Sequence, residues 1–269
     1  MTDFLPHHES IIRLSCFLAV LLLMMLWEWR DPRRSLGWPR AQRWPANLSI
    51  VAVDSIVVRL VFPLVAVEAA GLAEAHRWGL FHWLNAPFGF AFVASLLLLD
   101  LTIYTQHVLF HKIAWLWRLH RVHHTDLDFD VTTALRFHPL EIALSMAIKW
   151  IAVVALGAPP TAVILFEIIL NATAMFNHGN VRLSASLDRK LRRLLVTPDM
   201  HRVHHSVRRE ETDSNFGFNL SWWDHLFKTY RDQPQDGHIA MVIGLKDFRD
   251  RRATSLVGLL LQPFQNGRL

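Results

Sequence analysis

HRVHH occupies His120–His124 and is repeated without change at His201–His205. Each copy spaces three histidines three and four residues apart, so on a helix their imidazoles should point to one side. Two more histidines, His107 and His111, stand four apart before the first copy, and His178 lies between the copies in "FNHGN". Neutral imidazole is a ligand suited to iron, zinc, copper or nickel. These nine histidines exceed the need of one ion, so the pattern predicts a site for two metal ions.

Long apolar runs around these motifs predict membrane helices. Hydrophobic residues make up 52% of the 269-residue chain, and a helix needs about 20 mainly apolar residues to cross the hydrocarbon core. Five runs are candidates: 11–29, 47–70, 88–106, 140–157 and 160–177. The last two are short and are joined by "GAPP" at Gly157–Pro160, which predicts a helical hairpin. We therefore expect an all-α integral membrane protein with four to five membrane helices.

Basic residues gather at the same ends of these runs as the histidines. Five arginines follow the first run between residues 30 and 43, and five basic residues follow the fifth run between residues 182 and 193. Between the second and third runs, Arg77 is the only fixed positive charge. Cytoplasmic loops of membrane proteins carry an excess of lysine and arginine. We therefore expect the histidine-rich segments to form a helical cap on the cytoplasmic side, with the N-terminus outside.

Composition excludes several other classes of protein. The net charge of +5 does not indicate a nucleic-acid partner, because the basic residues flank apolar runs. Cys16 is the only cysteine, so the chain forms neither an intrachain disulfide nor an iron–sulfur cluster of its own. The hydrolase signatures G-x-S-x-G and H-E-x-x-H are absent. A histidine-rich metal transporter or sensor is an alternative, although transporter sites usually lie near the midplane and these histidines lie past the helix ends.

Acidic residues near the histidines are candidates to orient the imidazole rings through their second nitrogen. Asp100, Glu141, Asp199 and Asp224 have suitable positions in the sequence. Glu167 lies 11 residues before His178, about three helical turns, and we expect it to face the same site. The remaining isolated histidines are interpreted as ordinary surface or hydrogen-bonded residues: His7, His8, His76, His82, His225 and His238.

The order H-x3-H, H-x2-H-H, H-x2-H-H resembles that of the fatty acid hydroxylase and sterol desaturase superfamily. The flanking segments "LLLDLTIYTQH", "RFHPLE", "FNHGN" and "NFGFNLSWWDHLF" are also similar to segments of its bacterial members. The likeness covers about residues 90–265. It implies N-terminal membrane helices in 1–87 and a fatty acid hydroxylase-like catalytic domain in 88–269.

The resemblance also implies an activity: a non-haem di-iron oxygenase in the bacterial inner membrane, with its active site cytoplasmic. Such an enzyme hydroxylates or desaturates a lipid (a sterol, a fatty acyl chain or a related molecule), using O2 and electrons from a separate reductase or carrier. Carried over by motif position, the ligands of the two iron ions would be His107, His111, His120, His123, His124, His178, His201, His204 and His205, with His138 in "RFHPLE" as a further candidate.

Overall fold

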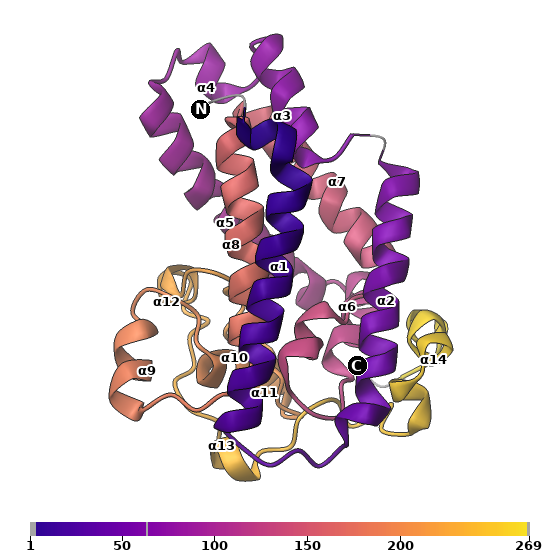
Figure 1. Cartoon of the computed structure of the whole chain (residues 1–269). Coiled ribbons are helices and arrows are strands. Elements are labelled where there is room, and N and C mark those ends of the chain that lie inside the picture. Colours follow the sequence, from indigo (N-terminus) through magenta and orange to yellow (C-terminus); the bar gives the residue numbers. More distant parts are fainter. Residues whose placement is uncertain (1–3, 63, 268–269) are drawn as a thin grey trace.

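The computed structural model describes residues 4–62 and 64–267, without the side chains of residues 4–7, so His7 lies outside the described side chains. Five long helices run side by side along one axis (Figure 1). They are α1 (Phe4–Arg30), α2 (Arg40–Val61), α5 (Phe88–Lys112), α7 (Pro139–Leu156) and α8 (Pro160–Asn177). The described residues form no β-strand, only isolated bridges. The fold is therefore all-α, as the apolar runs predicted.

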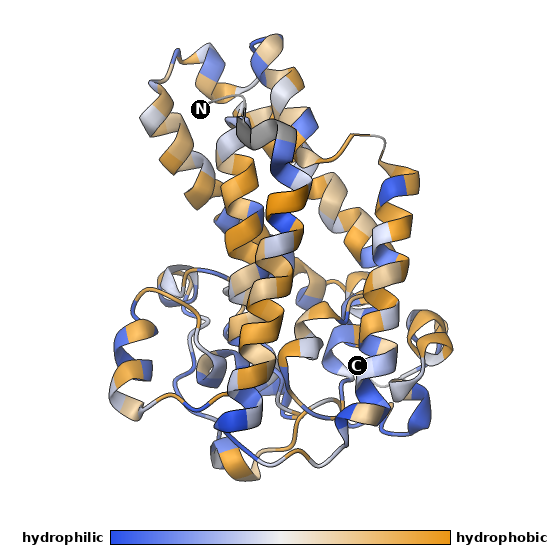
Figure 2. Cartoon of the chain, in the orientation of Figure 1, coloured by the Kyte–Doolittle hydropathy of each residue, from blue (hydrophilic) through white to orange (hydrophobic). Residues whose placement is uncertain are grey.

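The five helices have the length and composition of membrane spans. On α1, the exposed residues Leu14, Leu18, Leu22 and Leu26 repeat every four positions and form a continuous apolar stripe. Met24, on the opposite face, is buried against Met175 of α8. A helix that buries one apolar face in protein and exposes another needs lipid around it. The protein is an integral membrane protein, with the apolar helices grouped in one half of the molecule (Figure 2).

The second predicted run, 47–70, is wrong as a single helix. α2 begins earlier, at Arg40, and ends at Val61, and Phe62 is extended, with φ −113° and ψ 98°. Proline follows Phe62 in the sequence, and the residue before a proline is disfavoured in helical geometry. The chain resumes as a short separate helix, α3 (Ala66–Ala75), whose small side chains are buried against α7 and α8. Residue 63 itself lies outside the described part.

The predicted hairpin of α7 and α8 is present. Gly157 ends α7 in the left-handed conformation, with φ 66°, and its N–H is hydrogen-bonded to Val153 O. Gly79 lies so close to this turn that a Cβ on it would stand 2.1 Å from the Gly157 nitrogen. Glycine is required at both positions, because one needs a positive φ and the other a close backbone approach. The same end of the molecule holds α3 and α4 (Leu80–Trp83) (Figure 1).

The opposite end carries a cap of short helices that is more polar than the bundle (Figure 2). Its elements are α6 (Ala114–His124), η1 (Val131–Leu135), α9 (Ala185–Leu191), α10 (Pro198–His204), α11 (Arg209–Thr212), α12 (Trp222–Leu226), α13 (Gly237–Ala240), η2 (Arg251–Thr254), α14 (Leu256–Leu261) and η3 (Gln262–Phe264). All histidine motifs lie at this end, as the distribution of basic residues predicted. The turn of the hairpin and the N-terminal end of α1 lie at the other (Figure 1).

Candidate metal centre

Nine buried histidines converge in two neighbouring groups inside the cap. The five-histidine group consists of His107, His111, His120, His124 and His204, and the four-histidine group of His123, His178, His201 and His205. Within each group, one ring nitrogen from every residue lies within 4.8 Å of the others. The residues come from the end of α5, from α6, from the end of α8 and from α10. Two consecutive helices, α5 and α6, thus meet α8 and α10 from later in the chain.

The two HRVHH motifs do not each turn three imidazoles to one side, as the spacing had suggested. His120 and His124 belong to the five-histidine group, whereas His123 on the same helix belongs to the four-histidine group. The second copy does the reverse, because His201 and His205 join the four-histidine group and His204 joins the five-histidine group. Each motif therefore bridges the two groups.

In four of the rings, Nδ1–H is hydrogen-bonded to a protein oxygen. Nε2 of the same ring then faces the centre of its group. His107 Nδ1 donates to Phe216 O at 2.7 Å, His178 Nδ1 to Ala174 O at 2.7 Å, and His204 Nδ1 to Ser214 O at 2.6 Å. His120 Nδ1 donates to the carboxylate of Glu141 at 2.6 Å. In each of these four rings Nε2 carries the free lone pair.

The inward-facing nitrogens lie at the spacing of ligands that share a metal ion. His107 Nε2 stands 3.1 Å from His120 Nε2, and His178 Nε2 stands 3.0 Å from His123 Nε2 and 3.1 Å from His201 Nε2. Two nitrogens bonded at 2.0–2.1 Å to one ion and at right angles to each other lie about 3 Å apart. His204 Nε2 and both ring nitrogens of His111 and His205 are buried without a hydrogen-bond partner. A metal ion in each group would bind one nitrogen of each of these rings, and His111 Nδ1 lies 3.4 Å from Asp213 Oδ1.

Burial keeps the cap histidines neutral. It lowers the pKa of His120 to about 3 and that of His178 to about 3. The pKa values of His123, His201 and His205 lie well below the usual range, because burial and then the neighbouring imidazoles disfavour the charged form. A neutral imidazole is the form that binds a metal. The residues present therefore fit metal ions as their ligand.

His138, the tenth candidate ligand, lies outside both groups. It is the N-cap of α7, where its Nδ1 accepts a hydrogen bond from the Leu140 N–H at 3.1 Å, and its Nε2 donates to Leu260 O at 3.2 Å. Both nitrogens are thus used by the helix cap and by the C-terminal segment. His225, which was not expected to be a ligand, also lies apart, with its ring against Tyr230.

Of the acidic residues expected to orient the rings, only Glu141 contacts one directly. Asp224 acts one step away, because its carboxylate accepts from the N–H groups of Phe216 and Gly217 and so fixes the loop whose carbonyl holds His107. Asp100 binds the Leu220 N–H and the Trp223 indole. Asp199 pairs with Arg33 and Arg202. These last two residues support the fold around the groups.

The expectation that Glu167 faces the histidine site is wrong. Its carboxylate is buried between helices, where it binds Lys149 of α7 and, at 3.0 Å, Arg13 of α1. A carboxylate within a membrane helix needs a cationic partner, and two are supplied here. Glu167 therefore joins α1, α7 and α8 at a distance of three helical turns from His178.

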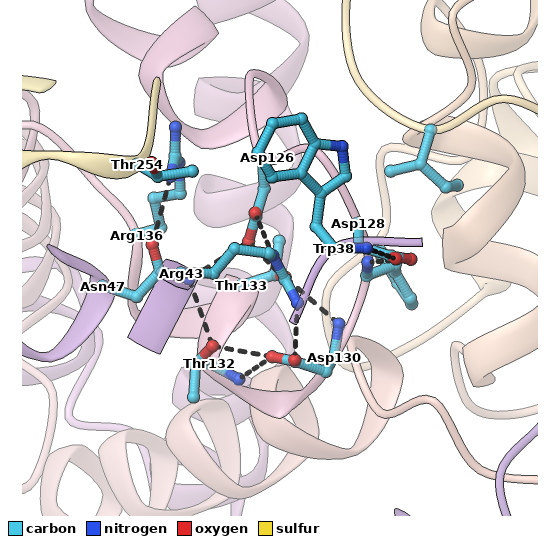
Figure 3. Close-up of polar contacts among 12 residues, drawn as sticks. Trp38, Arg43, Asn47, Asp126, Asp128, Asp130, Thr132, Thr133, Arg136 and Thr254 are labelled. Carbon is cyan, nitrogen blue, oxygen red and sulfur yellow. Dashed lines mark hydrogen bonds and ion pairs between the residues drawn. The ribbon is translucent and has the colours of Figure 1, made fainter. Parts of the chain in front are cut away.

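The sequence did not reveal the network that holds the segment after the first HRVHH (Figure 3). Arg43 of α2 is fully buried and binds both carboxylate oxygens of Asp126, at 2.7 and 2.8 Å, and Asp130 at 2.7 Å. Asp128 accepts from the Gly37 and Trp38 N–H groups. The alternation of acids in "TDLDFD" was the available signal. These contacts attach the end of α6, with His123 and His124, to the segment between α1 and α2.

Aromatic rings enclose both groups. Phe216 contacts His107, His111 and His204, all of the five-histidine group. Phe129 contacts His178 and His205 of the four-histidine group. Phe137 stacks on His123, with ring centroids 4.4 Å apart. Such walls keep water from the ring nitrogens and favour their neutral state.

Comparison with known proteins agrees with this geometry. The family model for fatty acid hydroxylase matches residues 92–229, just over half of the chain. Ornithine lipid hydroxylase OlsE of Rhizobium tropici is 29% identical over 206 residues, 76% of this chain and 59% of that protein. Alkylglycerol monooxygenase of Homo sapiens is 28% identical over 164 residues, 57% of this chain and 34% of that protein. Cholesterol 25-hydroxylase of Homo sapiens is 25% identical over 139 residues, 51% and 49% of the two chains.

The chain spans less than two thirds of each of these relatives. All three are lipid hydroxylases or monooxygenases by name. No solved structure matches the chain significantly.

Proposed function

Because this chain belongs to the fatty acid hydroxylase family, we propose that it is a membrane-bound monooxygenase that hydroxylates a lipid at a centre of two iron ions. The observation that carries the proposal is the convergence of nine buried imidazoles in two groups, with their free nitrogens facing inward. An all-nitrogen donor set suits iron among other metals. The relatives' activities favour hydroxylation over desaturation as the outcome.

The nine histidines named above would hold the ions, one ion in each group. Bound there, iron would supply the activation of O2 that insertion into an unactivated C–H bond requires. The protein's own part is to fix the rings. Glu141 and the carbonyls of Phe216, Ala174 and Ser214 hold four Nδ1–H groups, so each Nε2 lone pair points inward before any ion arrives.

The reaction sets the remaining requirements. Monooxygenation of a lipid R–H consumes O2, two electrons and two protons and yields R–OH and water. One oxygen atom enters the C–H bond and the other leaves as water. We propose that a separate protein donor supplies the electrons on the cytoplasmic side, where the basic loops face.

The proposed substrate is a membrane lipid that reaches the cap from within the bilayer. The curated relatives act on an ornithine lipid, an alkylglycerol and cholesterol by name, which share large apolar parts. Phe218 connects the histidine groups to the core of the helix bundle. Its ring centroid lies 5.4 Å from that of His107, and it also packs against the apolar cluster of α3, α5, α7 and α8. We propose that the apolar chain of the lipid approaches the site beside Phe218.

The metal-transporter alternative gains no support from the structure. Glu167 and Lys149 are paired with each other inside the bundle, and Glu68 caps α3 by accepting from the Val65 N–H. Asp54 of α2 is buried with its Oδ1 unpaired, but a conduction path would need a series of ionisable groups free to bind a passing ion.

The proposal is tested by expressing the full chain in a bacterial host under 18O2 and analysing the lipids by mass spectrometry. We expect a lipid that carries one 18O atom and is absent from cells that express the His107→Ala variant. Purified protein from iron-replete cells should contain about two iron ions per chain. The absence of any 18O-labelled lipid, together with protein free of transition metal, would overturn the proposal.

A further inference from the structure

A cavity of about 720 Å3 opens on the cap beside α9, α10 and α13. Its wall includes four arginines, three aspartates and His238; the arginines and aspartates are Arg33, Arg182, Arg189, Arg192, Asp188, Asp199 and Asp232. None of these residues belongs to either histidine group. The cavity therefore has no part in holding the proposed metal ions.

Exposed positive charges lie along one side of the cavity, on and beside α9. Arg182, Arg189, Lys190 and Arg193, on and beside α9, are all exposed, and we call them the basic rim. Arg182 pairs with Asp31. Among the residues that the structure describes, Arg189, Lys190 and Arg193 form no ion pair, in contrast to Arg192, which is buried and pairs with Asp188 and Asp232. Uncompensated charges on one surface steer an oppositely charged partner.

His238 gives an independent sign that the cavity receives polar groups. Only 6% of the residue is exposed, yet neither ring nitrogen has a hydrogen-bond partner. The nearest acid is Asp199, whose carboxylate stands 3.6 Å from His238 Nε2. Buried polar side chains are normally satisfied. An arriving carboxylate or amide would supply the missing partner.

The cavity lies directly behind the four-histidine group. Asp199 precedes His201 by two residues on α10, and Arg182 follows His178 by four. Arg202, which binds Asp199, lies 5.2 Å from the centre of the Phe129 ring, and that ring contacts His178 and His205. The cavity wall is therefore connected to the candidate metal ligands through a few residues of the chain and a few side-chain contacts.

We propose that the cavity and its basic rim form the docking surface for the electron donor, a small acidic redox protein. The inference rests on the proposed function, which needs two electrons from outside the chain. Each one-electron donor would be oxidised by one electron at this surface, and two such encounters would complete the reduction. Leu187, Leu194 and Ile239 are exposed within the charged surface and provide the apolar contact that protein interfaces combine with a polar rim.

An anionic membrane surface is the less favoured partner. α13 lies at the end of the molecule opposite to α3 and α4, beyond the ends of the apolar helices (Figure 1). The cavity is lined partly by His238 and Ile239 of this helix and so lies at that end of the molecule.

Direct binding measurements test the inference without turnover. The full-length protein is placed in phosphatidylcholine nanodiscs, and its binding to a plant-type [2Fe–2S] ferredoxin, an acidic redox protein, is followed by biolayer interferometry. The test variant is Arg189→Glu/Lys190→Glu/Arg193→Glu. The matched control, Lys246→Glu/Arg251→Glu/Arg252→Glu, reverses three exposed charges near α14 instead. A neutralised variant, Arg189→Gln/Lys190→Gln/Arg193→Gln, serves if the reversed one does not fold.

We expect ferredoxin to bind the unchanged protein, and to bind it more weakly as salt rises, because exposed charges are screened. The rim variant should bind at least about 10-fold more weakly, and the control within about 2-fold of the unchanged protein. Basic cytochrome c should not bind. The inference fails if ferredoxin does not bind, if rim and control variants bind it alike, or if it binds only when part of the phosphatidylcholine is replaced by phosphatidylserine.

The same experiment separates this inference from the proposed function. Ferredoxin binding that requires the rim, in protein free of transition metal and without any 18O in lipid, would support the docking surface and overturn the lipid hydroxylase. If the lipid is labelled but the rim variant binds ferredoxin as well as the unchanged protein does, the docking inference alone is overturned.

Discussion

His123 and His204 hold the same position in two identical motifs, yet they belong to opposite histidine groups. The helical repeat splits each motif between the two groups. Successive residues on a helix are turned by about 100°, so the first and third histidines of H-x-x-H-H lie about 40° apart and the middle one about 60° to the other side. The outer pair of a motif therefore faces one group, and the middle histidine faces the neighbouring group.

The repetition of HRVHH follows from this geometry. One copy supplies two ligands to the five-histidine group and one to the four-histidine group, and the second copy supplies the opposite numbers. Together the copies give three ligands to each group. The differences between the groups come from the other helices, because α5 adds His107 and His111 to one and α8 adds His178 to the other.

The first prediction is that His123→Ala and His204→Ala each remove one metal ion. Each change deletes a ligand from a different group, and the remaining ligands of the other group are untouched. Iron content should fall from about two ions to about one per chain in both variants. Membrane insertion should persist, because apolar runs specify the helices. Elemental analysis of detergent-purified protein measures the metal, and two ions retained in either variant would show that the assignment of that histidine is wrong.

His138→Asn is the matched control. Asparagine is a good N-cap, so it should keep the first turn of α7 in place of the His138 side chain. The variant should hold the same metal content as the unchanged protein. A loss of one ion would mean that His138 moves to a ligand position when metal binds.

The second prediction concerns Glu141 as a positioning residue. Its carboxylate accepts the His120 Nδ1–H at 2.6 Å, which fixes the ring and makes Nε2 a stronger donor. Glu141→Ala should weaken metal binding by about 10–100-fold, and Glu141→Gln by less, because the amide oxygen still accepts this hydrogen bond. Competition with a chelator measures the affinity. Glu68→Gln, an exposed acid on α3 at the other end of the bundle, should leave affinity unchanged, and equal effects of the two glutamine variants would contradict the role of Glu141.

Sequence patterns predicted the parts of this structure that depend on local periodicity. Four of five apolar runs correspond to single helices, and the nine motif histidines come together. Runs of apolar residues, and histidines three or four residues apart, are local patterns of the sequence. They do not depend on how distant elements meet. The proposed division at residues 87 and 88 stays a prediction.

The parts that sequence reasoning missed depend on tertiary contacts. Glu167 is on the helix that ends at His178, but its partners Lys149 and Arg13 come from other helices. His138 lies in a segment similar to one of the family, "RFHPLE", but both its ring nitrogens are already hydrogen-bonded. One bonds to Leu140 N–H in the helix cap and the other to Leu260 O in the C-terminal segment. The carbonyls that orient His107 and His204 are main-chain atoms, which any residue could provide. No side-chain pattern marks them.

The third prediction tests the buried network of Arg43. Arg43→Met leaves Asp126 and Asp130 buried without their cation, and breaking a buried ion pair costs about 3–5 kcal/mol. The thermal unfolding midpoint in detergent should fall, and metal content with it, because the network holds the end of α6. Arg59→Met changes an exposed arginine on the same helix and should shift neither quantity. An unchanged midpoint for Arg43→Met would mean that the two acids find other partners.

The last prediction concerns the orientation in the membrane, on which the electron supply depends. Cys16 is the only cysteine, so a Cys16→Ser background permits single cysteines to be placed at will. Asn85 is exposed at the end of the molecule that holds α3 and α4, and Arg189 is exposed on the cap. With the basic loops facing the cytoplasm, a membrane-impermeant maleimide should label Asn85→Cys in intact cells. It should label Arg189→Cys only after the membrane is opened.

The opposite labelling pattern would place the histidine groups outside, away from the reducing compartment, and leave the proposed donor without access. Labelling of both positions from outside would mean that an even number of helices separates them, whereas α5, α7 and α8 lie between them here. If the missing span were α7 or α8, His107 at the end of α5 and His178 at the end of α8 would lie on opposite sides, because both helices must cross for the groups to form. Accessibility of two cysteines therefore tests the helix count and the metal centre together.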